Sequence, residues 1–302
     1  MNFNFYEFEI IVRIERHQDE KYPMKKFGEE LNLTKNQVKK IVDDLLIKEL
    51  IISTGLDKYQ LTLMGYEWLK PYRVKKAFIL AAGIGRRMKP ISLNTPKPLI
   101  LVHGKRIIET LLDSLLENGI QDIYIVRGYL AEQFDILKKK YPMINFLENP
   151  IYDEANSISS VYLIRNMMEN SYLLEANFLL YNKNIVRKYE YSSNYVAIKS
   201  NDLNNSYTIN TDESSKIIKK KAQNFYEMFG FFYLSKKDAK QMSFDLAEAF
   251  HVPKGKEKEW TSIPLKDYKM HYQISKRLVE NGDVIKLNTF EELKKIDQAY
   301  IG

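Results

Sequence analysis

The 302-residue chain contains no cysteine, so neither a disulfide bond nor a zinc site built on thiolates can form. It has only four histidines, at positions 17, 103, 251 and 271, and their spacing matches no common metal-binding motif. No apolar run is long enough to cross a bilayer. We also expect no signal peptide after Met1. These absences predict a soluble cytoplasmic protein without a membrane partner.

Basic residues outnumber acidic ones, with 46 Lys and Arg against 39 Asp and Glu, which gives a formal net charge of +7. This excess favours anionic partners, either nucleotides or nucleic acid, and does not choose between them. The chain is long enough for two domains with their own cores. We predict a winged-helix domain over residues 1–70, a short basic linker over 71–76 and a larger α/β domain over 77–302.

The first seventy residues have the order of elements that is typical of a winged helix, a small α+β domain. Apolar periodicity predicts helices over residues 3–17, 24–31 and 35–50, and Thr34 is a suitable N-cap for the third. A β-hairpin over residues 51–63 follows, with a turn at residues 55–58. A last helix is expected from about residue 62 to residue 69, before Pro71.

The third of these helices is the expected DNA-recognition helix. Tyr59, Leu61, Thr62 and Gly65 resemble the end of the wing in multiple-antibiotic-resistance-type regulators. Side chains in the first two turns of the third helix can hydrogen-bond base edges and phosphates. The residues concerned are Lys35, Asn36, Gln37, Lys39 and Lys40. Acids nearly balance bases in this segment, so dimerisation or docking is the alternative role. A homodimer is the expected assembly.

The stretch from Lys76 to Pro98 is the most informative part of the chain. Ala77–Ala82 is a short apolar run, which predicts a buried strand. The strand ends at Gly83-Ile84-Gly85, and Arg86 and Arg87 follow at once. Glycine permits positive φ angles and a close approach of the backbone to an anion. A glycine turn beside cationic side chains therefore predicts a phosphate-binding loop.

The rest of the chain alternates between expected strands and helices, which indicates a parallel sheet with covering helices. Ligands of such sheets bind outside the carboxyl ends of the strands, where Gly83 and Gly128 fall. One long buried strand is expected over residues 172–180 and another over residues 225–233. The other predicted strands span residues 99–102, 122–126 and 144–147, and the predicted helices span residues 106–118 and 130–140.

Leu80–Arg87, together with Pro90 and Pro96–Leu99, resembles the signature loop of sugar-phosphate and choline-phosphate nucleotidyltransferases. The resemblance covers about residues 75–300. It implies a Rossmann-like α/β fold with a mixed, mostly parallel sheet. It also implies that Arg87 and Lys97 contact the phosphates of a nucleoside triphosphate, CTP above all. The nucleotide-binding residues that it implies are Ala81, Ala82, Gly83, Gly85, Arg86, Arg87, Lys97, Gly128 and Tyr129.

Residues 148–168 resemble the stretch of choline-phosphate cytidylyltransferases that lies over the nucleotide and the acceptor. Trp260 and nearby aromatic residues can hold a quaternary ammonium group, such as that of phosphocholine, by cation–π contact. The alternatives are a well-capped helix that begins near Asn156 and aromatic residues that only fill the core. The expected acceptor pocket consists of Asn156, Ser157, Ser160, Glu175, Tyr226 and Trp260.

The chain departs from the family at the positions that hold magnesium. Hard cations prefer carboxylate oxygens, yet the positions that match the two family aspartates are Asn177 and Asn288. Thr261 stands where a third acid is usual. Glu175 precedes Asn177 by two residues, about 6–7 Å along a continuous strand, which is too far for it to substitute without rearrangement. We therefore expect weakened or absent Mg²⁺ binding.

Two functions remain open at this point. In the first, the protein is a degenerate nucleotidyltransferase that binds a nucleotide or a phosphocholine-like ligand and acts as a regulator through its winged helix. In the second, it is a working cytidylyltransferase that makes a CDP-choline-like product from CTP and a phosphorylated amino alcohol. Arg87 and Lys97 would then neutralise the triphosphate as pyrophosphate leaves. The missing carboxylates favour the first function.

Overall fold

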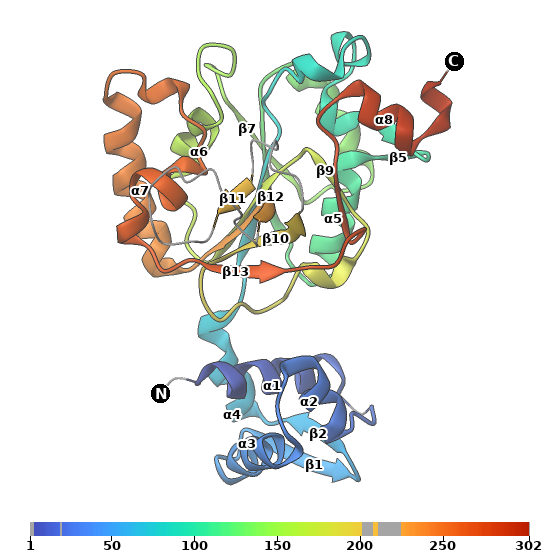
Figure 1. Cartoon of the computed structure of the whole chain (residues 1–302), viewed down its shortest axis with the longest axis vertical. Coiled ribbons are helices and arrows are strands. Elements are labelled where there is room, and N and C mark those ends of the chain that lie inside the picture. The colour runs from blue at the N-terminus through green and yellow to red at the C-terminus, as the bar shows by residue number, and fades with distance from the viewer. Residues whose placement is uncertain (1–2, 19, 201–207, 211–224, 302) are drawn as a thin grey trace. The chain divides into compact units, whose positions relative to one another are not determined.

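The computed structural model describes residues 3–18, 20–200, 208–210 and 225–301 (Figure 1). It divides into two compact units. The first contains Met1–Arg73 and Tyr189–Tyr191, and the second contains Val74–Lys188 and Ser192–Gly302. The division after Arg73 falls inside the segment that was predicted to be the linker. The inclusion of three residues from much later in the chain was not foreseen.

The first unit has the predicted order of three helices, a hairpin and a further helix. Thr34 caps α3 as expected, since its side chain accepts a hydrogen bond from the backbone N–H of Gln37. The third helix ends three residues earlier than predicted, because Glu49 adopts a positive φ of 55°. The elements are α1 (Phe5–Arg16), α2 (Met24–Leu31), α3 (Lys35–Ile47), β1 (Ile51–Gly55), β2 (Lys58–Leu61) and α4 (Leu63–Leu69). The assignment of this unit as a winged helix stays a prediction.

Tyr189 and Tyr191 belong to the hydrophobic core of the first unit. Tyr191 stacks on Tyr72, with ring centroids 5.8 Å apart and planes inclined by 6°. Its hydroxyl donates to the carbonyl oxygen of Phe3 at 3.1 Å. Aromatic pairs of this kind contribute about 0.5–1.5 kcal/mol beyond the area they bury. The three-residue segment is therefore a structural part of the first unit.

The second unit is built on a mixed, mostly parallel sheet, which confirms the predicted α/β class. The strand order is β13-β10-β12-β8-β3-β6-β7, and β11 pairs with β12. β12 runs antiparallel to its neighbours β8 and β10, whereas β8, β3, β6 and β7 are mutually parallel. The strands are β3 (Lys76–Leu80), β6 (Asp122–Arg127), β7 (Asn145–Glu148), β8 (Ser171–Glu175), β10 (Asn194–Ser200), β11 (Thr208–Asn210), β12 (Phe225–Leu234) and β13 (Ser275–Leu278).

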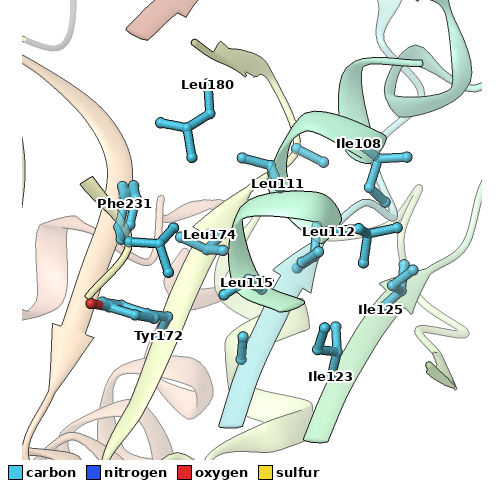
Figure 2. Packing of buried hydrophobic residues seen from close by; sticks show 14 of the residues in the cluster. Ile108, Leu111, Leu112, Leu115, Ile123, Ile125, Tyr172, Leu174, Leu180 and Phe231 are labelled. Atoms are coloured by element: carbon cyan, nitrogen blue, oxygen red, sulfur yellow. The ribbon is translucent and has the colours of Figure 1, made fainter. Parts of the chain in front are cut away.

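Helices cover both faces of this sheet (Figure 1). Side chains alternate between the faces along each strand, so that Leu174 joins the core under α5 and Leu173 joins the core under α6 and α7. Figure 2 shows the leucines of α5 packed over Leu174 and the isoleucines of β6. The helices are α5 (Ile107–Glu117), α6 (Ile158–Ile164), α7 (Lys236–His251) and α8 (Phe290–Ile296).

The single strand predicted over residues 172–180 is wrong. β8 ends at Glu175, and the chain then leaves the large sheet and forms β9 (Phe178–Leu180), which pairs with β14 (Val284–Lys286). The change of partner occurs at Asn177, whose carbonyl oxygen accepts a hydrogen bond from the backbone N–H of Leu287 at 2.9 Å. This break brings the C-terminal part of the chain beside the end of β8.

Two smaller predictions also need correction. The helix expected over residues 130–140 is 3₁₀ rather than α-helical, spanning Ala131–Lys139. The strand expected over residues 99–102 is reduced to β4 (Leu101–Val102), which pairs with β5 (Lys105–Arg106), because Lys97–Leu99 forms a 3₁₀ turn. Among the described residues, no helix is both long and apolar enough to cross a membrane.

Candidate functional site

A glycine turn follows β3, as predicted. Gly85 has a φ of +67°, and a Cβ at this position would lie 3.2 Å from the Cβ of Lys97. A Cβ at Gly83, in contrast, would meet no atom within 4 Å. Gly85 is therefore needed both for the backbone conformation and for the close approach of Lys97, whereas Gly83 leaves open space beside the backbone. Open backbone of this kind can hold an anion.

A pocket of about 280 Å³ opens where β3 and β8 end. It brings together residues that were predicted from three separate parts of the sequence. Those that line it are Ala81, Ala82, Gly83, Gly85, Lys97, Asn156, Ser157, Ser160, Glu175 and Asn177. The carboxyl ends of the parallel strands thus form the site, as the topology predicted.

Eight lining residues were not predicted as site residues, and four of them are polar: Asn149, Tyr152, Ser159 and Glu259. Asn149 is buried, and its side-chain amide donates to the hydroxyls of Ser159 at 2.9 Å and Ser160 at 3.1 Å. It follows β7 directly. Its position at the carboxyl end of a parallel strand was the signal in the sequence that pointed to it.

Asn156 and Ser157 line the pocket and also hold a neighbouring loop in place. The side-chain amide of Asn156 donates to the carbonyl oxygen of Glu257 at 3.0 Å, and the hydroxyl of Ser157 accepts from the backbone N–H of Trp260 at 3.1 Å. These bonds place the exposed carboxylate of Glu259 at the pocket. Asn156 and Ser157, which were predicted to contact a ligand, thus use part of their hydrogen-bonding capacity within the protein.

Trp260 and Tyr226 do not form the expected aromatic wall. Trp260 is fully buried, with a relative exposure of 0%, and lies edge-on to Phe232. A buried ring cannot offer its face to a ligand, so the predicted cation–π contact is wrong for Trp260. The ring of Tyr226 is already covered on one face by the ammonium of Lys276, 3.2 Å from its centroid. Neither residue lines the pocket.

Four residues predicted to bind the nucleotide lie outside the pocket lining: Arg86, Arg87, Gly128 and Tyr129. The hydroxyl of Tyr129 donates to the carbonyl oxygen of Leu93 at 3.0 Å, and a Cβ on Gly128 would lie 2.6 Å from the ring of Tyr152. Gly128 and Tyr129 therefore support the walls of the site. The exposed Arg86 and Arg87 lie on a 3₁₀ turn directly after the glycines, and their contact with phosphates stays a prediction.

Glu175 lies at the end of β8, with both carboxylate oxygens hydrogen-bonded. Oε1 accepts from the indole N–H of Trp260 at 3.1 Å, and Oε2 accepts from the side-chain amide of Asn177 at 2.9 Å. The sequence argument had placed Glu175 too far from Asn177, because it assumed a continuous strand. Burial raises the pKa of Glu175, and Lys286, Trp260 and Asn177 oppose this rise.

Gly230 on β12 makes room for this carboxylate. Its φ is +71°, and a Cβ here would lie 2.5 Å from the carboxyl carbon of Glu175. The position therefore needs glycine for two reasons, the backbone conformation and the closeness of the carboxylate.

Lys97 is the cationic side chain in the pocket lining. Burial lowers its pKa to about 8 from an ordinary value of 10.5. The charge of Glu175 and that of Glu292 oppose this fall, while Arg87 and Lys286 add to it. An anionic ligand would remove the conflict, because its charge stabilises the protonated amine.

The two asparagines that the resemblance sets at the family's magnesium positions lie on adjoining segments, and their role there stays a prediction. The hydrogen bond between Asn177 and Leu287 joins the start of β9 to the residue that precedes Asn288. The Oδ1 atoms of Asn177 and Asn288 are both buried, and neither has a hydrogen-bond partner among the residues that the structure describes. Buried acceptors normally have a donor, so each of these two oxygens is left with an unmet hydrogen bond.

These residues do not fit a divalent cation. Amide oxygens carry no charge. The carboxylates beside the two amides, Glu175 and Glu292, are already hydrogen-bonded within the protein, Glu175 through both oxygens and Glu292 through Oε2. Lys97 and Lys286 both lie within the electrostatic range of Glu175 and would repel a metal ion. In the described part of the chain, no group of three or more His, Asp or Glu residues is placed to share a metal ion.

The residues predicted to contact DNA lie at the start of α3 and are exposed. Gln37 is engaged locally, because its side-chain oxygen accepts hydrogen bonds at 2.8 Å from the backbone N–H and the hydroxyl of Thr34. Lys39 lies 3.8 Å from Asp43 on the same helix. Lys35, Asn36 and Lys40 are the best placed of the predicted set for an external partner.

Comparison with known proteins gives one family and several relatives. Residues 76–229 match the nucleotidyl transferase family. A 2-aminoethylphosphonate cytidylyltransferase from Lancefieldella rimae is 31% identical over 229 residues, which is 74% of this chain and 93% of that protein. A choline-phosphate cytidylyltransferase from Streptococcus pneumoniae is 39% identical over 142 residues, 47% of this chain and 61% of that one.

Solved structures agree with these matches. The CTP:phosphocholine cytidylyltransferase from Streptococcus pneumoniae superimposes with a TM-score of 0.65 at 28% identity, over 75% of this chain and 99% of that one. The inositol-1-phosphate CTP transferase from T. maritima gives a TM-score of 0.55 at 17% identity, over 74% of this chain and 96% of that one, and shows the likeness of fold alone.

Gly230→Ala tests the packing of Glu175. We expect a loss of about 2–5 kcal/mol in the free energy of unfolding, because the new methyl group combines a left-handed backbone with a clash against the carboxyl group. Gly282→Ala is the matched control: its φ is +93°, but a Cβ there meets nothing within 4 Å. The control should lose about 1–2 kcal/mol. Equal losses in urea denaturation would contradict the packing role.

The affinity for an anionic ligand should fall as the pH rises past the pKa of Lys97. A ligand phosphate needs the protonated amine, so affinity is full below about pH 8 and declines above it. We expect binding of CTP at pH 9 to be about tenfold weaker than at pH 7. In Lys97→Arg the decline should disappear, since arginine keeps its charge throughout this range. Titration calorimetry at several pH values measures these affinities. An equal decline in the natural chain and in Lys97→Arg would exclude Lys97 as the cause.

Proposed function

Because the chain belongs to the nucleotidyl transferase family, we propose that its second unit binds a cytidine nucleotide together with a phosphorylated amino alcohol or an amino phosphonate, and that the protein acts as a ligand-responsive regulator. The observation that carries this proposal is the pair of uncharged amides: Asn177 lines a pocket that also contains the glycine turn and Lys97, and Asn288 directly follows Leu287, which is hydrogen-bonded to Asn177. The relatives' names supply the classes of ligand.

The glycine turn and Lys97 are suited to the phosphates of the nucleotide. Gly83 leaves open backbone, and Lys97 lines the pocket with an amine that an anion would stabilise. Other lining residues carry hydroxyl and amide groups, among them Asn149 and Ser160, which can hydrogen-bond a base or an acceptor. The glycine turn and Lys97 would thus bind the phosphates, and these polar groups would recognise the rest of the ligands.

Turnover is disfavoured because the residues at the family's metal positions carry no negative charge. Nucleotidyl transfer in the family depends on a metal ion, which neutralises charge as the bond to the α-phosphorus changes. Asn177 and Asn288 keep the shape of aspartate and not its charge. Binding depends on the shape, the hydrogen bonds and the cationic side chains of the pocket, which the two asparagines leave in place, so it can persist where chemistry is lost.

The second candidate is a working cytidylyltransferase. It is favoured by the extent of the match to the 2-aminoethylphosphonate cytidylyltransferase, which reaches 93% of that protein's length. In this case the acceptor phosphate or phosphonate oxygen attacks the α-phosphorus of CTP and pyrophosphate leaves. Arg87 and Lys97 would then compensate the charge of the departing pyrophosphate.

Pyrophosphate release by the purified protein separates the two candidates. The assay contains CTP, magnesium and either phosphocholine or 2-aminoethylphosphonate, with each component omitted in turn. We expect no release above background from the natural chain, and a magnesium-dependent gain in Asn177→Asp/Asn288→Asp, because the two carboxylates restore the charge that a hard cation needs. Thr261→Asp alone is the control for an added acid beside Trp260. Release by the natural chain that needs all three components would establish the second candidate instead.

The regulatory role predicts that the first unit binds DNA and that ligands change this binding. Lys35→Ala/Lys40→Ala should reduce the slope of log K against log salt by about 0.9 for each lost phosphate contact. Lys21→Ala/Lys70→Ala removes the same charge away from α3 and should leave the slope unchanged. CTP with phosphocholine should change the affinity of the natural chain by about fivefold or more. Fluorescence anisotropy with a labelled duplex measures both effects, and an affinity that ligands leave unaltered would exclude the regulatory role.

A further inference from the structure

Two lysines stand close to the place where the family resemblance implies a divalent cation. Lys97 lines the pocket from the loop after the glycine turn. Lys286 belongs to β14 and precedes Asn288 by two residues. Both ammonium groups interact electrostatically with the carboxylate of Glu175. Positive charge is therefore built into this end of the site by side chains.

We infer that this site binds the triphosphate of a nucleotide without a divalent cation, and that the ammonium groups of Lys97 and Lys286 supply the positive charge in its place. The inference rests on the proposed function, since it concerns how the same pocket holds its nucleotide.

The position of Lys286 is fixed by its strand and by its own hydrogen bond. β14 pairs with β9 in a register that sets Lys286 opposite Phe178. Its ammonium donates to the carbonyl oxygen of Met228 on β12 at 3.1 Å. The amine thus reaches from β14 to the backbone of β12, and β14 pairs with the strand that begins where the chain leaves the large sheet. A charge held in this way needs little reorganisation when a ligand binds.

The arrangement around Glu175 favours ammonium groups over a metal ion. With an aspartate at position 177, two carboxylates would meet at the distance now spanned by a 2.9 Å hydrogen bond, and each would need a cation to relieve the repulsion. Asn177 donates to Glu175 instead. The amide therefore removes the requirement for a cation between these two side chains.

The unpartnered oxygens of Asn177 and Asn288 also favour hydrogen-bond donors. Both Oδ1 atoms are buried without a partner in the part of the chain that the structure describes. An ammonium group has three donors, and ribose and cytosine supply others. A buried acceptor that gains a donor on binding no longer carries the cost of an unmet hydrogen bond. The amide oxygens can thus accept hydrogen bonds from the nucleotide, and the lysines can neutralise the charge of its phosphates.

Calorimetric titration of the full chain with CTP, in magnesium and in EDTA, tests the inference. We expect the two affinities to agree within about threefold, well below the tenfold change that corresponds to 1.4 kcal/mol. Any difference should favour EDTA, because free magnesium competes with the protein for the triphosphate. Binding only in magnesium would overturn this inference and leave the proposed function intact. No binding in either buffer would overturn both.

Variants show whether the lysines carry the charge. In EDTA, Lys286→Met should weaken CTP binding by about tenfold or more, as expected for a lost contact to an anion. Lys286→Arg keeps the charge and should recover most of the affinity. Lys276→Met is the matched control, since Lys276 lies on β13 of the same unit with its amine over Tyr226. A melting curve confirms that each variant is folded. Unchanged affinity in folded Lys286→Met would overturn the role of Lys286.

Restoring the family's carboxylates gives an independent readout. Asn177→Asp/Asn288→Asp should bind CTP more weakly than the natural chain in EDTA, because the added negative charges repel the triphosphate. Magnesium should restore the affinity of this variant and not that of the natural chain. Equal dependence on magnesium in the two proteins would contradict the inference.

Discussion

The end of β8 places a carboxylate in a partly apolar pocket, and much of the site is organised around it. Removing a charge from water costs several kcal/mol unless partners compensate it. Glu175 receives hydrogen bonds from Trp260 and Asn177, and Gly230 leaves the space that its carboxyl group fills. Lys286 supplies its largest opposing charge. The need to accommodate this carboxylate thus accounts for three features: the buried tryptophan, the positive φ of Gly230 and the amide at position 177.

The break in the chain after Glu175 determines which segments can meet. Had residues 172–180 formed one strand, Asn177 would extend the large sheet, and Asn288 would have no reason to be near it. Instead, β9 pairs with β14 and carries Asn177 to the segment that contains Asn288. The pocket therefore depends on a pairing between residues more than a hundred positions apart. Long-range pairing of this kind also explains why the C-terminal segment belongs to the site.

Local signals in the sequence predicted much of this structure. The glycine turn, the Thr34 cap and the alternation of strands and helices depend on neighbours within a few residues, so a pattern in the sequence is enough to find them. The contact between Glu175 and Asn177 was missed because strand geometry was assumed to continue past the end of β8. The burial of Trp260 and the place of Tyr191 in the first unit were missed for a different reason. Both follow from packing between distant segments, and an aromatic residue in a sequence does not reveal whether its face is covered.

The replacement of aspartate by asparagine separates two properties that a metal site normally combines. The side chains have nearly the same volume, so the fold and the hydrogen-bonding shape of the pocket are retained. Their charges differ, and the balance of charge around Glu175 shifts from anionic residues towards Lys97 and Lys286. A site that releases pyrophosphate benefits from a metal ion that leaves with it, whereas fixed ammonium groups remain and continue to attract the anion. Under the proposed function, the substitution that disfavours turnover also favours retention of the nucleotide, which is the property that a ligand-responsive regulator needs.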